Sequence, residues 1–220
     1  MPVVLVHGVP ETTALWDRLV PLLDGPAITL ALPGFGNRRP DGFNSTMDEY
    51  FGWLERELEA VDGPIDLVGH DWGGILTYRL VSTKPGRVRS WASDAVGAGN
   101  PGFVWHDTAK LWQTPGEGEK FMENMQANPA GAGQVYESLG IPEPHATLFA
   151  NALDEEMSDS ILKLYRSATD IPGDWGPGIK PTDPGLVIGG DSDPFISARR
   201  STKAAAELGV EAVILEGGGH

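Results

Sequence analysis

The stretch Val68-Gly69-His70-Asp71-Trp72-Gly73-Gly74 decides the fold of this chain, because it links an apolar run to a helical pattern through a very tight turn. Such a turn leaves no room for a side chain at positions 69 and 73, so only glycine fits there. The pattern is typical of a nucleophile elbow, which lifts its middle side chain, here Asp71, into an open pocket. The alternative is that Asp71 serves only as the N-cap of the following helix.

An aspartate at the elbow predicts a particular chemistry. A carboxylate that attacks an sp³ carbon forms an alkyl ester, and water can then cleave that ester at the carboxylate's own carbonyl carbon. A serine in the same place would form an ether with such a substrate, which water does not cleave. The residue type therefore favours substitution at a saturated carbon, as in an epoxide or an alkyl halide.

Composition narrows the class of protein. The 220 residues suffice for one domain with a core, or for a domain with a small insertion. With 31 acidic and 16 basic residues the net charge is −15, which argues against a nucleic-acid partner. The absence of cysteine excludes disulfides and thiolate sites. No apolar run approaches the roughly 18 residues that cross a membrane, and the N-terminus lacks the features of a signal peptide. We therefore predict a cytoplasmic protein.

Short apolar runs alternate with amphipathic stretches along the chain. Near-continuous apolar runs predict strands of a parallel sheet buried on both faces, at residues 3–6, 27–30, 65–68, 88–92, 186–188 and 212–215. Helical patterns lie at residues 15–23, 46–61, 75–83 and 197–208. The second of these helices begins with a plausible capping box formed by Ser45 and Asp48. This alternation predicts an α/β fold with a doubly wound, mostly parallel sheet.

One region breaks the alternation. Residues 97–184 contain no clear strand and are rich in Trp, Tyr, Pro and Gly. We predict that they form a helical lid, inserted before the penultimate strand, over a core made of residues 1–96 and 185–220. Ligands of open α/β sheets bind at the carboxyl ends of the strands, so a lid there would shape the substrate pocket. The aromatic side chains either line that pocket or form the lid's own core.

Other loops at predicted strand ends carry residues suited to the chemistry of Asp71. The backbone N–H groups of Val9 and Trp72 would form an oxyanion hole, whereas His7 is interpreted as a buried structural residue. His220 follows the last strand and would act as general base, although it is also the last residue and could be merely terminal. Asp193 is the favoured carboxylate to orient that histidine, and Asp94, after the fourth strand, is the alternative.

Tyr165 in the lid has a predicted role as a proton donor, because an opened epoxide leaves an alkoxide that needs an acid. The alternative is that this tyrosine, at the end of a helical run, only packs in the core and takes no part in catalysis. A halide leaving group needs only N–H or aromatic-edge donors, and the indole of Trp72 could supply one.

Taken together, these residues resemble the α/β-hydrolase superfamily, in particular its epoxide hydrolase and haloalkane dehalogenase branch. Residues 69–74 are similar to the elbow of that branch, and residues 7–11 to its H-G-x-P oxyanion motif. Residues 190–195 are similar to the loop with the acid, where Asp193 matches, and residues 218–220 match the Gly-His that carries the base. Tyr165-Arg166 looks like the Tyr-Arg of epoxide hydrolase lids, and residues 112–119 also look like part of that lid. The resemblance covers essentially the whole chain.

The chain departs from this pattern in three ways. Epoxide hydrolases usually have a second lid tyrosine, expected where this chain has Thr108 and Leu111, and Tyr136 is a possible substitute. Many haloalkane dehalogenases have an asparagine where this chain has Val9, and related haloacetate dehalogenases have an arginine where it has Trp72, which weighs against halide chemistry. The fold also looks reduced at both termini, so an uncovered sheet face would favour a homodimer.

The resemblance and the residues together predict hydrolysis of epoxides to vicinal diols through an ester on Asp71. A haloalkane dehalogenase is the alternative enzyme, and a catalytically silent fragment or small-molecule binding module is the alternative outside catalysis. The expected partner is a small-molecule substrate. No metal and no cofactor are expected, because the histidines are scattered without ligand spacing.

Overall fold

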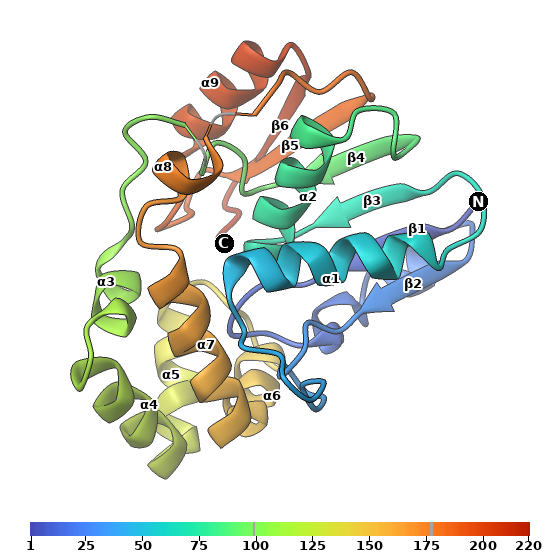
Figure 1. Cartoon of the computed structure of the whole chain (residues 1–220). Coiled ribbons are helices and arrows are strands. Elements are labelled where there is room, and N and C mark those ends of the chain that lie inside the picture. Colours follow the sequence, from blue (N-terminus) through green and yellow to red (C-terminus); the bar gives the residue numbers. More distant parts are fainter. Residues whose placement is uncertain (99, 177) are drawn as a thin grey trace.

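A six-stranded parallel sheet forms the centre of the computed structural model, which describes residues 1–98, 100–176 and 178–220. The strand order is β2-β1-β3-β4-β5-β6, and each neighbouring pair runs parallel (Figure 1). The strands are β1 Val3–Val6, β2 Ala27–Leu30, β3 Asp66–Gly69, β4 Ser90–Ser93, β5 Gly185–Gly190 and β6 Glu211–Leu215. The predicted sheet is confirmed, and four of its strands have bounds shifted by one or two residues.

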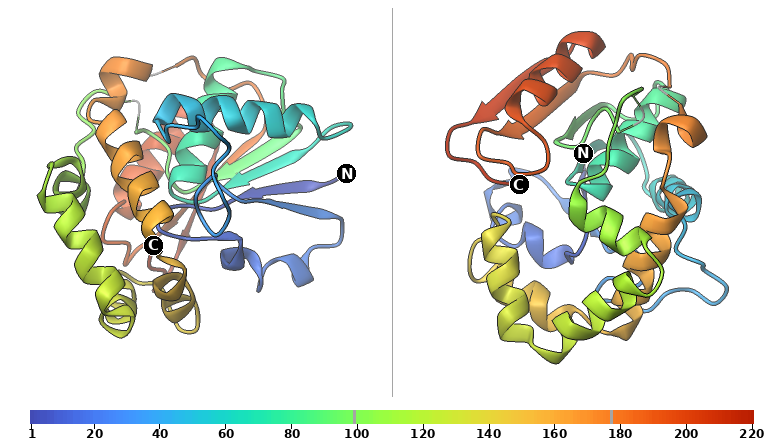
Figure 2. Two further views of the ribbon diagram at one scale, coloured as in Figure 1. Left: turned by 60° about the horizontal axis from the view of Figure 1, so that its bottom comes forward. Right: turned by 90° about the vertical axis from the view of Figure 1, so that its left-hand side faces the viewer.

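Helices cover both faces of this sheet. They are α1 Met47–Glu59, α2 Trp72–Thr83 and α9 Ala198–Leu208, together with the 3-10 helices η1 Thr13–Trp16 and η2 Val20–Leu22. Figure 2 shows α1 on one face of the sheet and the 3-10 helices on the other. Along the sheet, α2 packs on β3 and β4, and α9 packs on β5 and β6.

Two helix predictions were wrong in detail. The helix predicted at residues 15–23 is split into the two 3-10 turns, because Pro21 stands in the first turn of η2 and supplies no N–H for a continuous helix. The capping box of α1 is formed by Thr46 and Glu49 rather than by Ser45 and Asp48. Ser45 has a φ of +57°, which places it outside the helix.

Close packing of the elbow against β1 depends on one glycine. A Cβ at Gly73 would lie 2.2 Å from the carbonyl oxygen of Val6, closer than any side chain tolerates. The first turn of α2 can therefore approach the end of β1 only without a side chain here. This approach brings the loop after β1 next to the elbow and fixes the position of the site.

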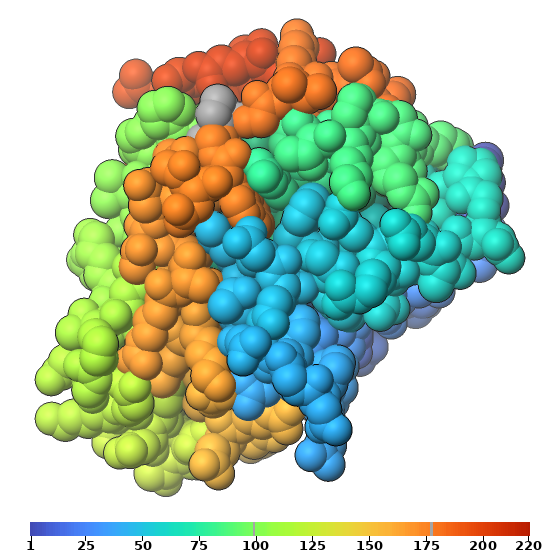
Figure 3. Space-filling model, in the orientation of Figure 1, coloured from blue at the N-terminus to red at the C-terminus, as the bar shows by residue number. Residues whose placement is uncertain are grey.

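Among the described residues of the lid region, residues 97–184, helices are the regular secondary structure. It contains α3 Asp107–Gln113, α4 Glu117–Ala127, α5 Pro129–Ser138, α6 His145–Ala152, α7 Glu155–Ser167 and α8 Ile171–Trp175. Figure 3 shows α7 lying directly against the chain that leads into α1. The Arg39 guanidinium contacts Asp159 at 2.6 Å, and the N–H of Met47 donates to Ser167 Oγ at 2.8 Å. These contacts fix the lid on the core.

Exposed apolar side chains are found at the sheet edge. Val213 and Leu215 on β6 are 37% and 53% exposed, so this edge strand is only half covered. The prediction of a homodimer remains a prediction. Within the described ranges, no helix has the length and apolar character needed to cross a membrane.

Candidate active site

The elbow holds Asp71 in a strained backbone conformation at the end of β3. Its φ of +50° lies in the region that favours glycine, and such strain is typical of functional sites. Asp71 stands at the N-cap position of α2, yet its side chain makes no capping hydrogen bond. The carboxylate instead lines a cavity beneath the lid. The geometry therefore favours a functional role over simple capping.

Three predicted residues from separate loops meet here. Nδ1 of His220 lies 2.9 Å from Oδ2 of Asp193, and Nε2 of the same ring lies 3.5 Å from Oδ2 of Asp71. The loop after β5 fixes Asp193, whose Oδ1 accepts the N–H groups of Phe195 and Ile196 at 2.7 and 2.9 Å. One ring thus joins an orienting carboxylate to the carboxylate at the elbow, as in a catalytic triad.

Charges at the site favour an ionised Asp71. Burial raises the pKa of its carboxyl, but the hydrogen bond and charge of His220, followed by the charge of His70, outweigh burial and lower this pKa below its usual value. Burial likewise opposes the charged form of His220, yet the hydrogen bonds to Asp193 and Asp71 raise its pKa to about 10. The histidine is thus an imidazolium at neutral pH while Asp71 carries its charge.

The loop after β1 brings the N–H of Val9, one of the two predicted oxyanion donors, to Asp71. The N–H of Val9 donates to Oδ1 of Asp71 at 2.9 Å. The N–H of Trp72 makes no such bond to Asp71 in the described structure, so its part stays a prediction. His7 is fully buried, and its Nε2 accepts the N–H of Leu32 at 3.1 Å, as expected of a structural residue.

Asp94, the alternative acid, does not contact His220. Its Oδ2 forms a very short contact with Nδ1 of His70, and its Oδ1 accepts the backbone N–H of Asp71 at 2.9 Å. Nε2 of His70 lies 3.2 Å from Oε1 of Glu11, whose Oε2 accepts the N–H of Gly8 at 2.9 Å. Asp94 and His70 thus belong to a chain of contacts that links the elbow to the loop after β1.

The contacts between Asp94, His70 and Glu11 favour a charged histidine. Burial opposes protonation of His70, but the charges of Asp94 and Glu11 and their hydrogen bonds raise its pKa well above the usual value. The ring of His70 lies 4.9 Å from that of His220, centroid to centroid. Neither Glu11 nor the role of His70 followed from the sequence, since the partners are far apart in the chain.

A cavity of about 670 Å³ opens above Asp71. Tyr165 of α7 lines it and is 1% exposed, and its ring packs edge-on against Trp72 with centroids 5.6 Å apart. Burial and the nearby charge of Asp71 raise the pKa of this tyrosine well above its usual value. The phenol therefore keeps its proton at neutral pH. Tyr136 and Thr108 also line the cavity.

Sequence reasoning missed His106. This residue caps α3, because its Nδ1 accepts the N–H of Ala109 at 3.2 Å, and its ring lies 6.5 Å from that of Tyr165. Burial lowers the pKa of His106, which favours the neutral ring. Because Nδ1 accepts the N–H of Ala109, the proton of that neutral ring lies on Nε2. A histidine beside Trp105 at the start of a lid helix was the only signal in the sequence.

Within the described residues, no group of three or more histidine, aspartate or glutamate side chains is arranged to hold a metal ion.

Comparison with known proteins places the chain in a family. The model of the alpha/beta hydrolase family matches residues 3–220. A haloalkane dehalogenase of Psychrobacter cryohalolentis is 33% identical over 92 residues, which are 39% of this chain and 30% of that protein. A haloalkane dehalogenase of Agrobacterium fabrum is 32% identical over 133 residues, 56% of this chain and 43% of that protein. The matched stretch thus spans less than half the length of these relatives.

Solved structures show the same fold. The haloalkane dehalogenase DbeA from Bradyrhizobium elkani superposes with a TM-score of 0.77 at 22% identity, over 99% of this chain and 82% of that one. A putative epoxide hydrolase from Pseudomonas aeruginosa also has a TM-score of 0.77, at 20% identity, over 97% and 80%. The fold agrees with the family match. The chain belongs to the alpha/beta hydrolase family.

Proposed function

We propose that the protein hydrolyses epoxides to vicinal diols through an ester on Asp71. The observation that carries this proposal is the buried, protonated phenol of Tyr165, which lines the same cavity as the ionised carboxylate. Ring opening needs a nucleophile and a proton donor acting on adjacent atoms of the substrate. The cavity offers one of each, on the sheet and on the lid.

In the first step, Oδ2 of Asp71, the oxygen that Val9 does not hold, attacks an epoxide carbon. The carbon–oxygen bond of the ring breaks, and the epoxide oxygen takes the proton of Tyr165. Nε2–H of His106 donates a second hydrogen bond to this oxygen, in the part expected of a second lid tyrosine. The phenolate regains a proton from water.

In the second step, water hydrolyses the ester. Loss of the charge on Asp71 lowers the pKa of His220, so the imidazolium releases its proton to solvent, which balances the proton that the phenolate took up. The neutral ring then takes a proton from water, and the hydroxide attacks Cγ of Asp71. The N–H groups of Val9 and Trp72 stabilise the oxyanion. The diol leaves with the proton returned by His220, and the carboxyl group of Asp71 passes its own proton to the ring, which restores the resting charges. Asp193 keeps the ring oriented throughout.

One observation favours a second candidate, haloalkane dehalogenation. The indole Nε1 of Trp112, a residue that lines the cavity, is buried and has no hydrogen-bond partner among the described residues. A buried N–H without a partner is costly, and a halide ion is an acceptor that would satisfy it. Both curated relatives reported above carry the name of this activity.

The two functions can be separated by mass spectrometry of the intact His220→Ala variant after incubation with epichlorohydrin, which contains both an epoxide and a chloride. Without the base, the ester should accumulate on Asp71. An adduct that retains chlorine, visible in its isotope pattern, shows ring opening. An adduct lighter by HCl shows halide displacement and makes the dehalogenase the better assignment.

Two controls complete the experiment. The Asp71→Asn variant should form no adduct, which locates the ester. Circular dichroism checks that His220→Ala is folded. If the folded variant forms an adduct with neither the epoxide nor the chloride end of epichlorohydrin, both enzyme functions are wrong, and a binding module becomes the better description.

A further inference from the structure

The cavity does not end at the catalytic residues, because one helix face extends its wall. Arg200, Lys203, Ala204 and Glu207 of α9 all line it. These positions are three or four residues apart and therefore form one stripe along the helix. The stripe begins next to Phe195 and Ile196, which follow Asp193 and also line the cavity. The charged residues of α9 thus continue directly from the loop that carries the acid.

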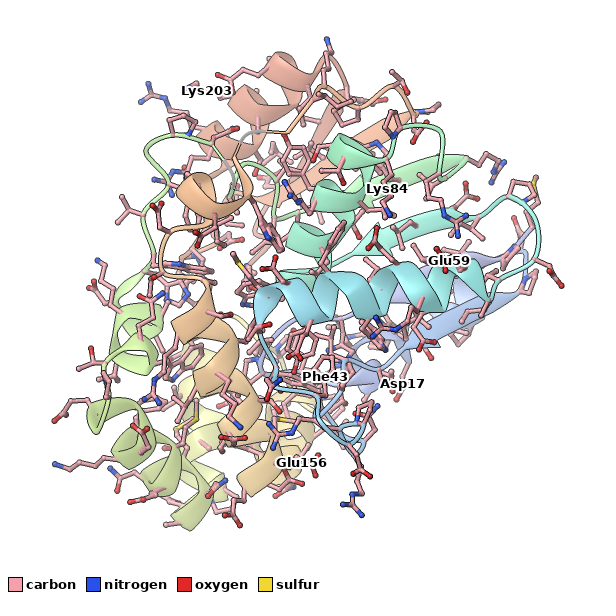
Figure 4. The ribbon with its side chains drawn as sticks, viewed as in Figure 1. Asp17, Phe43, Glu59, Lys84, Glu156 and Lys203 are labelled. Atoms are coloured by element: carbon pink, nitrogen blue, oxygen red, sulfur yellow. The ribbon has the colours of Figure 1, made fainter. Side chains whose placement is uncertain are left out.

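The described part of the segment after β4 forms the facing wall. Ala95, Val96 and Phe103 line the cavity on this side. A Cβ built at Gly97 would lie 4.0 Å from the Cβ of Ala204, so this segment and α9 are in van der Waals proximity. Figure 4 shows Lys203 on α9 at the upper edge of the molecule, next to this segment. The outer end of the cavity therefore lies between α9 and this segment.

The other end of the cavity is apolar. Met122 and Met125 of α4 and Tyr136 of α5 line it, and all are at least 93% buried. Figures 1 and 2 place α4 and α5 on the opposite side of the chain's C-terminal end from α9. Since that end is His220, the reacting groups lie between an apolar arm and an arm that ends in charged side chains.

The outer arm of the cavity carries two basic residues, Arg200 and Lys203, although the protein as a whole is acidic. Lys203 has a partner, because its Nζ lies 3.6 Å from Glu207 on the exposed helix surface. Arg200, nearer to the catalytic loop, makes no ion pair with any described residue. An arginine can bind a carboxylate through two parallel N–H···O bonds, so Arg200 is suited to an anionic group of a bound molecule.

We propose that Arg200, assisted by Lys203, forms an anion subsite that selects amphipathic substrates, namely epoxides with an apolar chain on one side and a carboxylate on the other. This inference rests on the proposed function for the nature of the reacting group. The apolar chain occupies the arm lined by α4 and α5, and the carboxylate reaches α9.

The experiment compares internal epoxides of a short, a medium and a long monounsaturated fatty acid, each as free acid and as methyl ester. For at least one spacing, the wild type should prefer the acid by about 10-fold in kcat/KM. The Arg200→Ala/Lys203→Ala double variant should lose this preference and keep its activity on the ester. The Arg199→Ala variant is the matched control, because Arg199 precedes Arg200 but does not line the cavity, and it should behave as the wild type.

Two results would overturn the subsite. One is an acid-to-ester ratio near one at all three spacings in the wild type. The other is a preference for the acid that survives the double substitution. A proportional loss of activity on acid and ester would also contradict it, since that indicates general damage rather than loss of anion recognition.

A binding measurement separates this inference from the proposed function. Decanoate and decanol are titrated calorimetrically into the wild type and the double variant, with no turnover needed. Decanoate should bind about 10-fold more weakly to the double variant, and decanol equally to both. If epoxides are not hydrolysed but decanoate shows this loss, the proposed function fails and the subsite stands. Equal binding of decanoate to both proteins refutes the subsite, whatever the enzyme hydrolyses.

Discussion

The carboxylate of Asp94 accepts the backbone N–H of Asp71 at 2.9 Å, so it holds the elbow itself rather than the ring of His220. Its other oxygen contacts His70, which in turn reaches Glu11 on the loop after β1. Two carboxylates at neighbouring strand ends thus have different tasks, since Asp193 alone of the two contacts His220.

This division of tasks predicts different effects of removing each charge. Asp193→Asn should slow hydrolysis of the ester by about 100-fold or more, because His220 loses its orienting carboxylate. Asp94→Asn should lower the free energy of unfolding by about 2 kcal/mol, because His70 loses one of its two carboxylate partners, and should slow hydrolysis much less. Single-turnover kinetics and urea unfolding measure the two effects. Equal accumulation of the ester in both variants would contradict the assignment of Asp193.

Tyr165→Phe should reduce ring opening by about 100-fold, because the phenyl ring retains the packing and removes the proton donor. Displacement of chloride from a primary alkyl chloride, if the enzyme performs it, should change little. The matched control is Tyr136→Phe, which removes a hydroxyl from another tyrosine of the cavity wall. Rates of single-turnover ester formation provide the measurement, and equal losses in both variants would count against a special role for Tyr165.

His106→Asn tests the second donor without removing the cap of α3, since asparagine is a good N-cap residue. Ring opening should slow by about 10-fold because one hydrogen bond to the departing oxygen is lost. The thermal midpoint of unfolding should stay close to that of the wild type. A wild-type rate of ring opening in a stable variant would show that His106 only caps the helix.

The pH dependence of the second step follows from the charge on Asp71. In the free enzyme the pKa of His220 is raised to about 10 by Asp193 and Asp71, so the ring holds a proton below that pH. Esterification removes the charge of Asp71 and lowers this pKa. Hydrolysis of the ester should therefore rise with pH and reach its plateau below pH 10. Single-turnover rates between acid and alkaline pH test this, and a rate that falls as pH rises would be inconsistent with a histidine base.

The sequence by itself determined the class of fold and the elbow. These depend on local patterns: apolar runs predict buried parallel strands, and a strand, a glycine turn and a helix in succession define where Asp71 stands. The sequence also singled out His220 and Tyr165, because few other side chains near strand ends or in the lid can transfer a proton.

Only the tertiary structure decided between Asp193 and Asp94, because both follow strands whose carboxyl ends meet at the same edge of the sheet. Which of them reaches His220 depends on loop geometry and on competition from His70, and neither is encoded in short-range spacing. The same holds for His106 and for Arg200 on α9. Their neighbours in space are distant in the chain, so only the packing of lid and core brings these side chains to one cavity.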